Sequence, residues 1–362
     1  MKKVLFVFNH PAPYKVRLLN ELSKEFDLSV IFERDSNSDR NKKFYEENKI
    51  NFNRILIKGI KLFRENFLSA GITKIIKNNK FDLIVMNGYS TFAEAHAIRY
   101  MKKHNIPYVL YINGGIIRKH ESKLRKSYKT KMISGAKAYF SPDKESNKYL
   151  VYYGAEEKRI LNYTYSTIYE KEIIKSPLTK KEKIAAREKL GLNFENLFVS
   201  AGQLIKRKNY LELVKVWKNK QDGLLIFGEG KQRQQIEKFI KKNDLKNVIL
   251  MGHKSRDEMF KYFAIADAFV FPSNEDIYGH VINEAFSQGL PVISTENVNS
   301  AKKLINENLN GFLVKHVNCG CFDVALDKIK KADLTKGAIK TAKENTIEIM
   351  VKEHIKMFNE VK

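Results

Sequence analysis

The segment PSNEDIYGHVINEAFSQGLPVIST, which begins at Pro272, carries two adjacent carboxylates and a glycine turn ahead of a predicted helix. The chain turns at Gly279, the helix is expected to open at His280, and Glu284 lies one turn further on. Backbone N–H groups in the first turn of a helix are free to bind an anion, and carboxylates accept hydrogen bonds from hydroxyls. The segment therefore predicts a site that binds a diphosphate and sugar hydroxyls together, a combination that suits a nucleotide-sugar.

A second segment, VSAGQLIKRKN from Val199 to Asn209, places a glycine turn and a cluster of cations after an expected strand. Such a cluster can bind a diphosphate, and Lys208 is the first choice, with Arg207 beside it. A solvated basic turn is the alternative interpretation. Further along, LLIFGEG ends an apolar run in a turn whose Gly228 either lets the main chain approach a ligand or serves the turn geometry alone.

Asp276 and Glu284 are separated by seven residues, and Ala285 and GLPVI follow. This pattern resembles the signature of glycosyltransferase family 4, also called glycosyltransferase group 1. The similarity runs from about Phe198 to about Val314. It implies a retaining enzyme of the GT-B fold, an α/β architecture in which two Rossmann-like domains face each other across a cleft. Two positions depart from the family pattern, because Asp276 replaces the usual Glu and Gln203 replaces a common Arg.

The resemblance also implies roles for individual residues. Asp276 is expected to contact the donor sugar, Glu284 the ribose and Lys208 the diphosphate, while His120 is the candidate for a first-domain histidine that contacts the sugar. These four are the expected catalytic residues. The expected donor-binding residues are Gly202, Gln203, Arg207, Lys208, Gly228, Glu275, Asp276, Gly279, His280, Val281 and Glu284. The resemblance also implies that no metal and no other cofactor is needed, and no D-x-D triplet occurs in the sequence.

The N-terminal half alternates apolar runs with segments long enough for crossover helices, which predicts a parallel, Rossmann-like sheet. The expected strands are Val4–Phe8, Leu28–Phe32, Leu83–Met86 and Tyr108–Ile112, and the expected helices include Val16–Phe26 and Phe92–His104. Ligands of such sheets bind beyond the carboxyl ends of the strands. The expected acceptor-side residues are Asn9, Pro11, Tyr14, Asn87, Gly114 and Gly115. Neither half carries G-x-G-x-x-G after its first strand, so dinucleotide redox chemistry has no support.

With 362 residues, 43% of them hydrophobic, the chain is long enough for two domains. Residues 1–172 are expected to bind the acceptor, residues 173–338 the nucleotide-sugar, and residues 339–362 to form a helix that packs back on the first domain. No apolar run reaches eighteen residues, and the run near the N-terminus is short and followed by two prolines, which favours a cytoplasmic protein. Cys319 and Cys321 are too few for a disulfide framework, and their C-x-C spacing is interpreted as incidental rather than as a zinc site.

The formal net charge of +25 is spread over both halves of the chain, is larger in the N-terminal half and is densest between Arg118 and Lys137. The apolar edge expected on a helix in this stretch consists of Leu124, Tyr128, Met132 and Ala136. A basic helix with one apolar edge can lie on anionic lipid, which predicts peripheral contact with the inner face of the plasma membrane. A solvated helix in a lysine-rich chain is the alternative.

Together these patterns predict a retaining glycosyltransferase that moves a sugar from a nucleotide-sugar, with a UDP-sugar as the first choice, to a surface polysaccharide or lipid-linked oligosaccharide. One alternative is a non-catalytic subunit that binds a nucleotide-sugar or a partner transferase. Nucleic-acid binding is a distant third, because the basic excess is spread widely and no RNA- or DNA-binding motif occurs. No nucleic-acid partner is therefore expected. A nucleotide-sugar epimerase or a phosphorylase of the same fold remains open as well.

Overall fold

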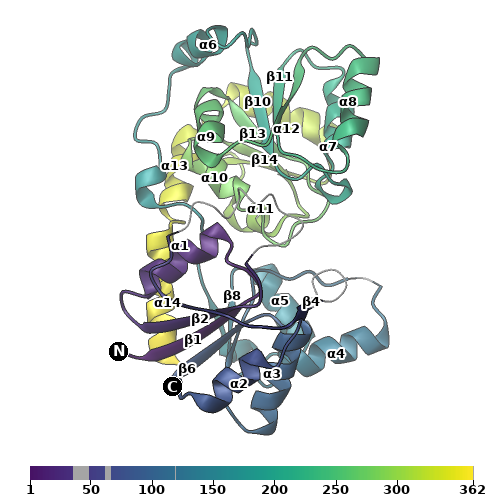
Figure 1. The fold of residues 1–362 in the computed structure, drawn as a ribbon. Helices are drawn as coiled ribbons and strands as arrows, with labels where there is room; N and C mark the ends of the chain where they lie inside the picture. Colours follow the sequence, from purple (N-terminus) through teal and green to yellow (C-terminus); the bar gives the residue numbers. More distant parts are fainter. Residues whose placement is uncertain (36–48, 62–66, 119, 362) are drawn as a thin grey trace. The chain divides into compact units, whose positions relative to one another are not determined.

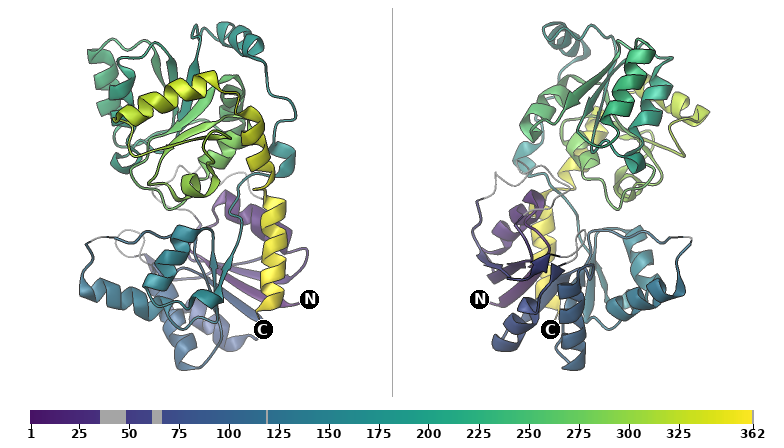
Figure 2. Two further views of the ribbon diagram at one scale, coloured as in Figure 1. Left: turned by 180° about the vertical axis from the view of Figure 1, so that it is seen from behind. Right: turned by 45° about the vertical axis from the view of Figure 1, so that its right-hand side comes forward.

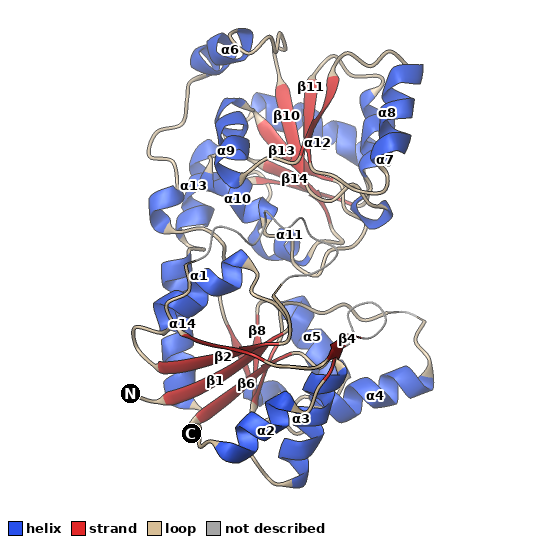
Figure 3. Ribbon diagram, in the orientation of Figure 1, coloured by secondary structure: helices blue, strands red, loops and turns tan. Residues whose placement is uncertain are grey.

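A computed structural model describes residues 1–35, 49–61, 67–118 and 120–361. The chain divides into two compact units (Figure 1). Unit 1 consists of Met1–Ser166 together with Ile347–Lys362, and unit 2 consists of Thr167–Thr346. Each unit has a parallel sheet with helices on both faces (Figures 2 and 3). The expected pair of Rossmann-like α/β folds is confirmed.

The sheet of unit 1 has seven parallel strands in the order β3-β2-β1-β6-β7-β8-β9. Their bounds are Asn53–Leu56 (β3), Asp27–Phe32 (β2), Lys3–Phe8 (β1), Leu83–Asn87 (β6), Val109–Tyr111 (β7), Ala138–Ser141 (β8) and Ile160–Asn162 (β9). The central strands are apolar without alternation because helices bury both of their faces. The strand order reverses between β1 and β6, which is where ligands usually bind in such a sheet.

The helices of unit 1 follow the predicted alternation. Their bounds are Pro13–Leu22 (α1), Gly71–Asn78 (α2), Phe92–Lys103 (α3), Lys123–Ile133 (α4), Lys144–Tyr152 (α5) and Ile347–Glu360 (α14). A short hairpin of β4 (Ile60–Lys61) and β5 (Phe67–Leu68) precedes α2. The helix predicted to begin at Val16 begins at Pro13 instead, because proline's fixed φ and missing N–H suit the first turn of a helix.

Helix α14 completes unit 1 although it follows all of unit 2 in the sequence. Phe358 packs against Phe26 and stacks on Phe140, and the Nζ atom of Lys2 donates to the carbonyl of Phe358. His354 is fully buried among the rings of this layer. The single helix expected over residues 339–361 is in fact two helices, since α13 (Thr335–Lys343) ends before α14 begins.

The sheet of unit 2 has six parallel strands in the order β12-β11-β10-β13-β14-β15 (Figure 3). Their bounds are Val248–Gly252 (β12), Gly223–Phe227 (β11), Leu197–Ala201 (β10), Ala268–Phe271 (β13), Val292–Thr295 (β14) and Gly311–Val314 (β15). The order reverses between β10 and β13. The two segments with predicted chemistry follow these two strands, so parallel pairing brings both to one edge of the sheet.

Helices cover both faces of this sheet and bury an apolar layer on each. Their bounds are Lys180–Glu188 (α6), Tyr210–Trp217 (α7), Arg233–Lys242 (α8), Arg256–Ile265 (α9), Val281–Ser287 (α10), Asn299–Leu304 (α11), Gly320–Lys331 (α12) and α13 as given above. Phe263 and Ile265 of α9 are buried in the core, as their helical spacing predicted, and Met259 and Tyr262 pack against it.

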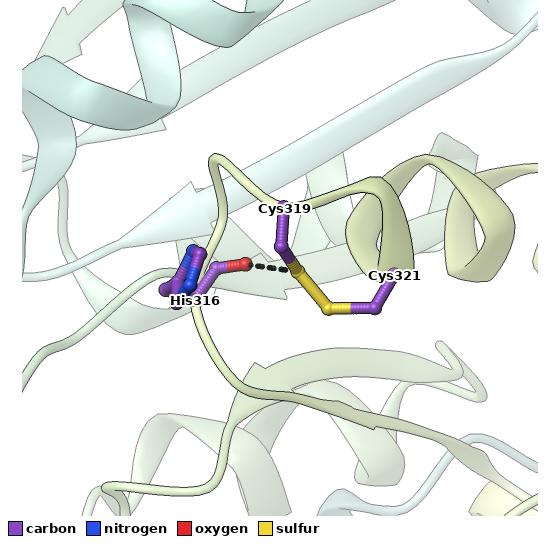
Figure 4. The surroundings of a disulfide bond; sticks show 3 residues. All are labelled: His316, Cys319 and Cys321. Atoms are coloured by element: carbon purple, nitrogen blue, oxygen red, sulfur yellow. Dashed lines mark hydrogen bonds between the residues drawn. A yellow bond between two sulfur atoms is a disulfide. The ribbon is translucent and has the colours of Figure 1, made fainter.

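Cys319 and Cys321 form a disulfide at the start of α12, and the Sγ atom of Cys319 lies 2.9 Å from the carbonyl oxygen of His316 (Figure 4). The bond joins residues two apart and so ties no separate elements together. The C-x-C spacing, interpreted above as incidental, did not predict this disulfide. Its position at a helix start explains how the two sulfurs meet, since the chain turns into α12 between them.

Candidate functional site

Two loops of unit 2 are tied together at the carboxyl edge of its sheet. The loop after β10 contains a short 3-10 turn, Lys206–Lys208, and the loop after β13 begins at Pro272. The carbonyl of Arg207 accepts hydrogen bonds from the backbone N–H of Asn274 at 2.8 Å and from the Oγ of Ser273 at 3.2 Å. The predicted basic turn and the predicted acidic loop are therefore neighbours.

The most prominent polar contact of this edge joins the Nζ of Lys208 to the Oδ2 of Asp276. The two side chains are 11% and 10% exposed, so this is a largely buried ion pair. Nζ also lies 4.5 Å from the centre of the Phe271 ring, and a guanidinium nitrogen of Arg207 lies 3.9 Å from the same Asp276 oxygen. Two cations thus converge on one carboxylate that the sequence assigned to sugar binding.

Glycines bring the main chain of the loop after β10 close to that of the loop after β11. Gly202 and Gly228 follow β10 and β11 with φ values of 157° and 137°. A Cβ added to Gly228 would lie 1.9 Å from the carbonyl oxygen of Gly202, so no side chain fits there. This contact favours the turn-geometry interpretation of Gly228. Gln203, at the position where the family often has Arg, follows Gly202 directly.

The acidic loop is held by its own backbone. The N–H of Asp276 donates to Asn297 at 3.1 Å, and the Oδ1 of Asp276 accepts from the N–H of Tyr278 at 3.3 Å. Gly279 turns the chain with φ 97°, and its carbonyl accepts from the Oγ of Ser300 at 3.0 Å. The expected helix follows as α10, with His280 at its N-cap and Val281 as its first residue. Glu275 stays at the surface side of the loop, where its carbonyl accepts from Arg207 at 3.1 Å.

Glu284 of α10 lies in a polar cluster that the sequence did not reveal. Its Oε1 atom accepts a hydrogen bond from the Oγ1 of Thr167 at 3.1 Å and lies 3.9 Å from the Nε of Arg256. Arg256 also donates to the carbonyl of Thr167 at 3.0 Å and lies 3.6 Å from a carboxylate oxygen of Glu172. Helix α9 and the segment after β9 therefore both contact Glu284. The ion pair depends on contacts between distant segments, which no local pattern encodes.

The expected acceptor-side residues lie at the carboxyl edge of unit 1. The Oδ1 of Asn9, just after β1, accepts from the Nζ of Lys15 at 3.2 Å, and the Oδ1 of Asn87, at the end of β6, accepts from Asn113 at 3.0 Å. Tyr14 packs edge-on against Tyr165. Pro11 is buried at the start of the loop that leads into α1.

The glycine turn after β7 serves packing in unit 1. Gly114 has φ 138°, and a Cβ added to Gly115 would lie 2.4 Å from the ring of Tyr149. His120 is exposed and lies two residues before the N-cap of α4, Ser122. Among the described residues, no hydrogen bond or ion pair joins His120 to the other expected catalytic residues, and its assigned role stays a prediction.

The sequence did not predict a pair of buried carboxylic acids, Glu33 and Glu94, in unit 1. The Oγ1 of Thr91 donates to Glu33 at 2.5 Å, while Glu94 accepts from the backbone N–H groups of Ser90 at 2.7 Å and Thr91 at 3.1 Å. Burial raises the pKa of Glu33 to about 8, with the nearby Glu94 charge adding to the rise, and burial raises the pKa of Glu94 to about 7. The T-x-x-E capping-box spacing of Thr91 and Glu94 could have found one of them.

The basic helix of unit 1 is α4, and its predicted apolar edge has two different environments. Met132 is completely buried, whereas Leu124 is 85% exposed and Tyr128 is partly exposed. Around them Lys126 lies 4.1 Å from the ring centre of Tyr152, and Lys129 pairs with Glu121 at 2.7 Å. The first half of α4 therefore presents an apolar residue among cations.

Comparison with known proteins adds to this geometry. Residues 182–345, nearly all of unit 2, match the family described as Glycosyl transferases group 1. Unit 2 belongs to this family. The chain is 34% identical over 90 residues to the UDP-N-acetylglucosamine–peptide N-acetylglucosaminyltransferase GtfA subunit of Streptococcus agalactiae, which covers 25% of this chain and 17% of that relative. It is 28% identical over 167 residues to the alpha-monoglucosyldiacylglycerol synthase of Acholeplasma laidlawii, which covers 42% of each chain. The aligned segments thus span less than half of each of these two relatives.

Solved structures resemble the whole chain rather than unit 2 alone. The crystal structure of Anabaena Alr3699/HepE in complex with UDP has a TM-score of 0.79 and 15% identity, and the match covers 99% of this chain and 100% of that one. The GT-B fold implied by the group 1 resemblance is confirmed.

Two features are absent from the described residues. In residues 1–35, 49–61, 67–118 and 120–361, no helix is both long and apolar enough to cross a bilayer. Over the same ranges, no three or more His, Cys, Asp or Glu side chains gather where they could share a metal ion.

Proposed function

We propose that the protein is a retaining glycosyltransferase that transfers one sugar from a UDP-sugar to a glycan or lipid-linked acceptor. The observation that carries this proposal is the buried pair of Lys208 and Asp276 at the carboxyl edge of the unit 2 sheet. A lysine beside a carboxylate at this edge supplies the two chemistries that a sugar diphosphate requires. Membership of unit 2 in the group 1 family supports the same activity.

Each side chain has a distinct task in the proposed reaction. The bond between the anomeric carbon and the diphosphate breaks through a cation-like state, so negative charge grows on the departing diphosphate. Lys208 stabilises that charge, with Arg207 as the second cation. Asp276 accepts hydrogen bonds from the sugar hydroxyls, and Glu284 accepts them from the ribose. The diphosphate competes with Asp276 for the Nζ of Lys208.

UDP is the proposed nucleotide because proteins similar to this chain carry it in their names. The GtfA subunit is named for UDP-N-acetylglucosamine, and the structure of Alr3699/HepE is a complex with UDP. Unit 2 has the glycine turns and the cations that a diphosphate needs, whichever base is attached.

The acceptor is proposed to be presented at an anionic membrane surface, which unit 1 meets through α4. Leu124 is exposed at the start of this helix, and Lys123, Arg125 and Lys126 surround it. An exposed leucine among cations matches an anionic bilayer, because the cations attract the headgroups and the leucine enters the acyl boundary. The similar synthase from Acholeplasma laidlawii is named for a diacylglycerol lipid.

The test is incubation of the full chain with UDP-, GDP-, dTDP- and ADP-sugars and liposomes, scored for nucleotide release and thermal shift. A thermal shift by the UDP series, with release lost in Glu284→Ala, is the expected result. Leu190→Ser, an exposed position in unit 2, is the control that leaves release unchanged. Absence of a shift with every nucleotide contradicts the donor site.

A nucleotide-sugar binder without turnover is the second candidate, favoured by Gln203 and Asp276 at positions where the family usually has Arg and Glu. It predicts a thermal shift with UDP-sugars and no nucleotide release under any acceptor condition. The same panel therefore separates the two functions.

A further inference from the structure

The carboxylate of Glu284 is held from one side only. Both of its described contacts, the hydrogen bond from Thr167 at 3.1 Å and the approach of Arg256 to 3.9 Å, involve the same oxygen, Oε1. Within the described part of the chain, no hydrogen bond to Oε2 is recorded. The side chain is 17% exposed, so Glu284 is neither sealed in the core nor free in solvent.

Arg256 is itself fixed by contacts with the segment after β9 and with its own helix. One of its terminal nitrogens donates to the carbonyl of Thr167 at 3.0 Å and lies 3.6 Å from Glu172, and its guanidinium lies 5.1 Å from the ring centre of Phe260. The Oε2 atom of Glu172 in turn accepts from the N–H of Tyr169 at 2.7 Å. A guanidinium that is held by several groups restricts the rotamers of the carboxylate beside it.

We propose that Arg256, with Thr167, is a positioning residue that orients Glu284 so that its second oxygen receives the ribose hydroxyls of the donor, which makes the site selective for ribonucleotides over 2′-deoxyribonucleotides. This inference rests on the proposed function. Arg256 and Thr167 both contact Oε1 and so hold Glu284 in one orientation, which leaves Oε2 for the ligand. A hydrogen bond to a charged carboxylate is strong enough to discriminate between the two sugars.

The experiment compares the affinities of UDP and 2′-deoxy-UDP for the full chain by calorimetry. Wild type is expected to bind UDP at least about tenfold more tightly, the effect of one hydrogen bond to a charged group. In Arg256→Gln the UDP affinity falls while the 2′-deoxy-UDP affinity changes little, so that the ratio drops to within about threefold. Arg256→Lys restores part of the ratio, because a charge remains without the planar fork.

Thr167→Val provides a second variant that removes one hydroxyl and keeps the volume, and it is expected to reduce the same ratio. Arg159→Gln is the matched control, since Arg159 forms a surface ion pair with Glu156 in unit 1. It leaves the ratio at the wild-type value. Thermal unfolding of each variant separates a loss of fold from a loss of orientation.

Equal weakening of both nucleotides in Arg256→Gln and Thr167→Val, or an unchanged ratio, overturns the positioning role and leaves the donor site standing. Wild type that binds UDP without discrimination also overturns it. Wild type that binds neither nucleotide overturns the donor site and the positioning role together.

Discussion

The ammonium group of Lys208 and the carboxylate of Asp276 form an ion pair across 68 residues of sequence, and each side chain is about nine-tenths buried. Removing one member of such a pair leaves an uncompensated charge in a largely dry environment, which typically costs about 3–5 kcal/mol. Replacing both members of the pair leaves no uncompensated charge.

The first prediction follows from this pair. Lys208→Met is expected to lower the turnover number by about 10²–10³-fold, because charge on the leaving diphosphate loses its main counter-charge. The same variant loses stability, whereas Lys208→Met with Asp276→Asn recovers most of the stability and none of the turnover. Initial rates of nucleotide release and urea unfolding, followed by the single tryptophan, Trp217, in unit 2, measure the two effects. Equal stability of all three proteins would contradict the buried pair.

Gly228 gives a second prediction, which concerns the main chain. Its φ of 137° and the 1.9 Å approach of an added Cβ to the Gly202 carbonyl leave no room for alanine. Gly228→Ala should destabilise unit 2 by about 3 kcal/mol or more and weaken UDP binding. Gly320→Ala is the control, since nothing lies within 4 Å of its added Cβ. Trp217 fluorescence in urea measures both variants, and a similar midpoint for the two would refute the close approach.

His354 predicts that unit 1 weakens in acid. Burial lowers the pKa of His354 to about 4, although its Nδ1 contact with the Met350 carbonyl opposes the shift. The unfolded chain therefore takes up the proton first, so stability is full above about pH 6.5 and falls by up to about 3 kcal/mol as the pH drops toward 4. His354→Phe should flatten this dependence, which hydrogen exchange of the unit 1 strands would measure. If the stability of His354→Phe falls with pH as steeply as that of wild type, other groups cause the pH dependence.

The buried carboxyl group of Glu33 is expected to lower the stability of unit 1 as the pH rises, the opposite of the effect of His354. Its pKa is raised by burial to about 8, so the folded protein holds a proton that the unfolded chain releases near pH 4.5. Its contribution to stability is therefore complete below about pH 4.5 and is lost as the pH rises through 8. Glu33→Gln should reduce the decline of unit 1 stability between pH 6 and 8.5, read by the same hydrogen-exchange measurement. Glu156→Gln, at an exposed ion pair with Arg159, should leave the decline as in wild type.

Helix α4 predicts lipid binding that depends on charge and on one leucine. Leu124→Ser and Lys126→Gln should each reduce sedimentation with anionic liposomes, the lysine by about 1 kcal/mol of binding free energy. Leu190→Ser, which removes a leucine that is 56% exposed in unit 2, is the matched control. Binding that is the same in all four proteins, or that persists on neutral liposomes, would argue for a solvated helix.

The sequence predicted β1, β2, β6 and β7 of unit 1 because their apolar runs are buried, whereas β3, β8 and β9 of the same sheet were not predicted. Runs such as Val4–Phe8 are apolar throughout, and the structure extends that strand by one residue to Lys3. The two loops with predicted chemistry in unit 2 meet at the carboxyl edge of its sheet, because the shared direction of parallel strands places each loop that follows a strand at that edge. Local signals were sufficient for these features.

What the sequence did not predict depends on contacts between distant segments. Nothing near Arg256 marks it as the neighbour of Glu284, since Thr167 and Glu172 reach the pair from another part of the chain. The buried state of Glu33 likewise depends on Thr91, which belongs to a different loop. The sequence located the basic helix, but α4 ends at Ile133 and leaves Ala136 of the predicted apolar edge outside it, while Met132 is buried and Leu124 is exposed.

Helix α14 belongs to unit 1 but is synthesised after the whole of unit 2. Unit 2 is one continuous stretch of chain and can fold during translation as soon as Thr346 has left the ribosome. Unit 1 cannot complete its fold until α14 has been made, because Phe26 and Phe140 lack the partner ring of Phe358 before then. The nascent chain therefore carries an exposed apolar face on its earlier-made half while its later-made half is already folded. During that interval the earlier half is the part most exposed to chaperones and to aggregation.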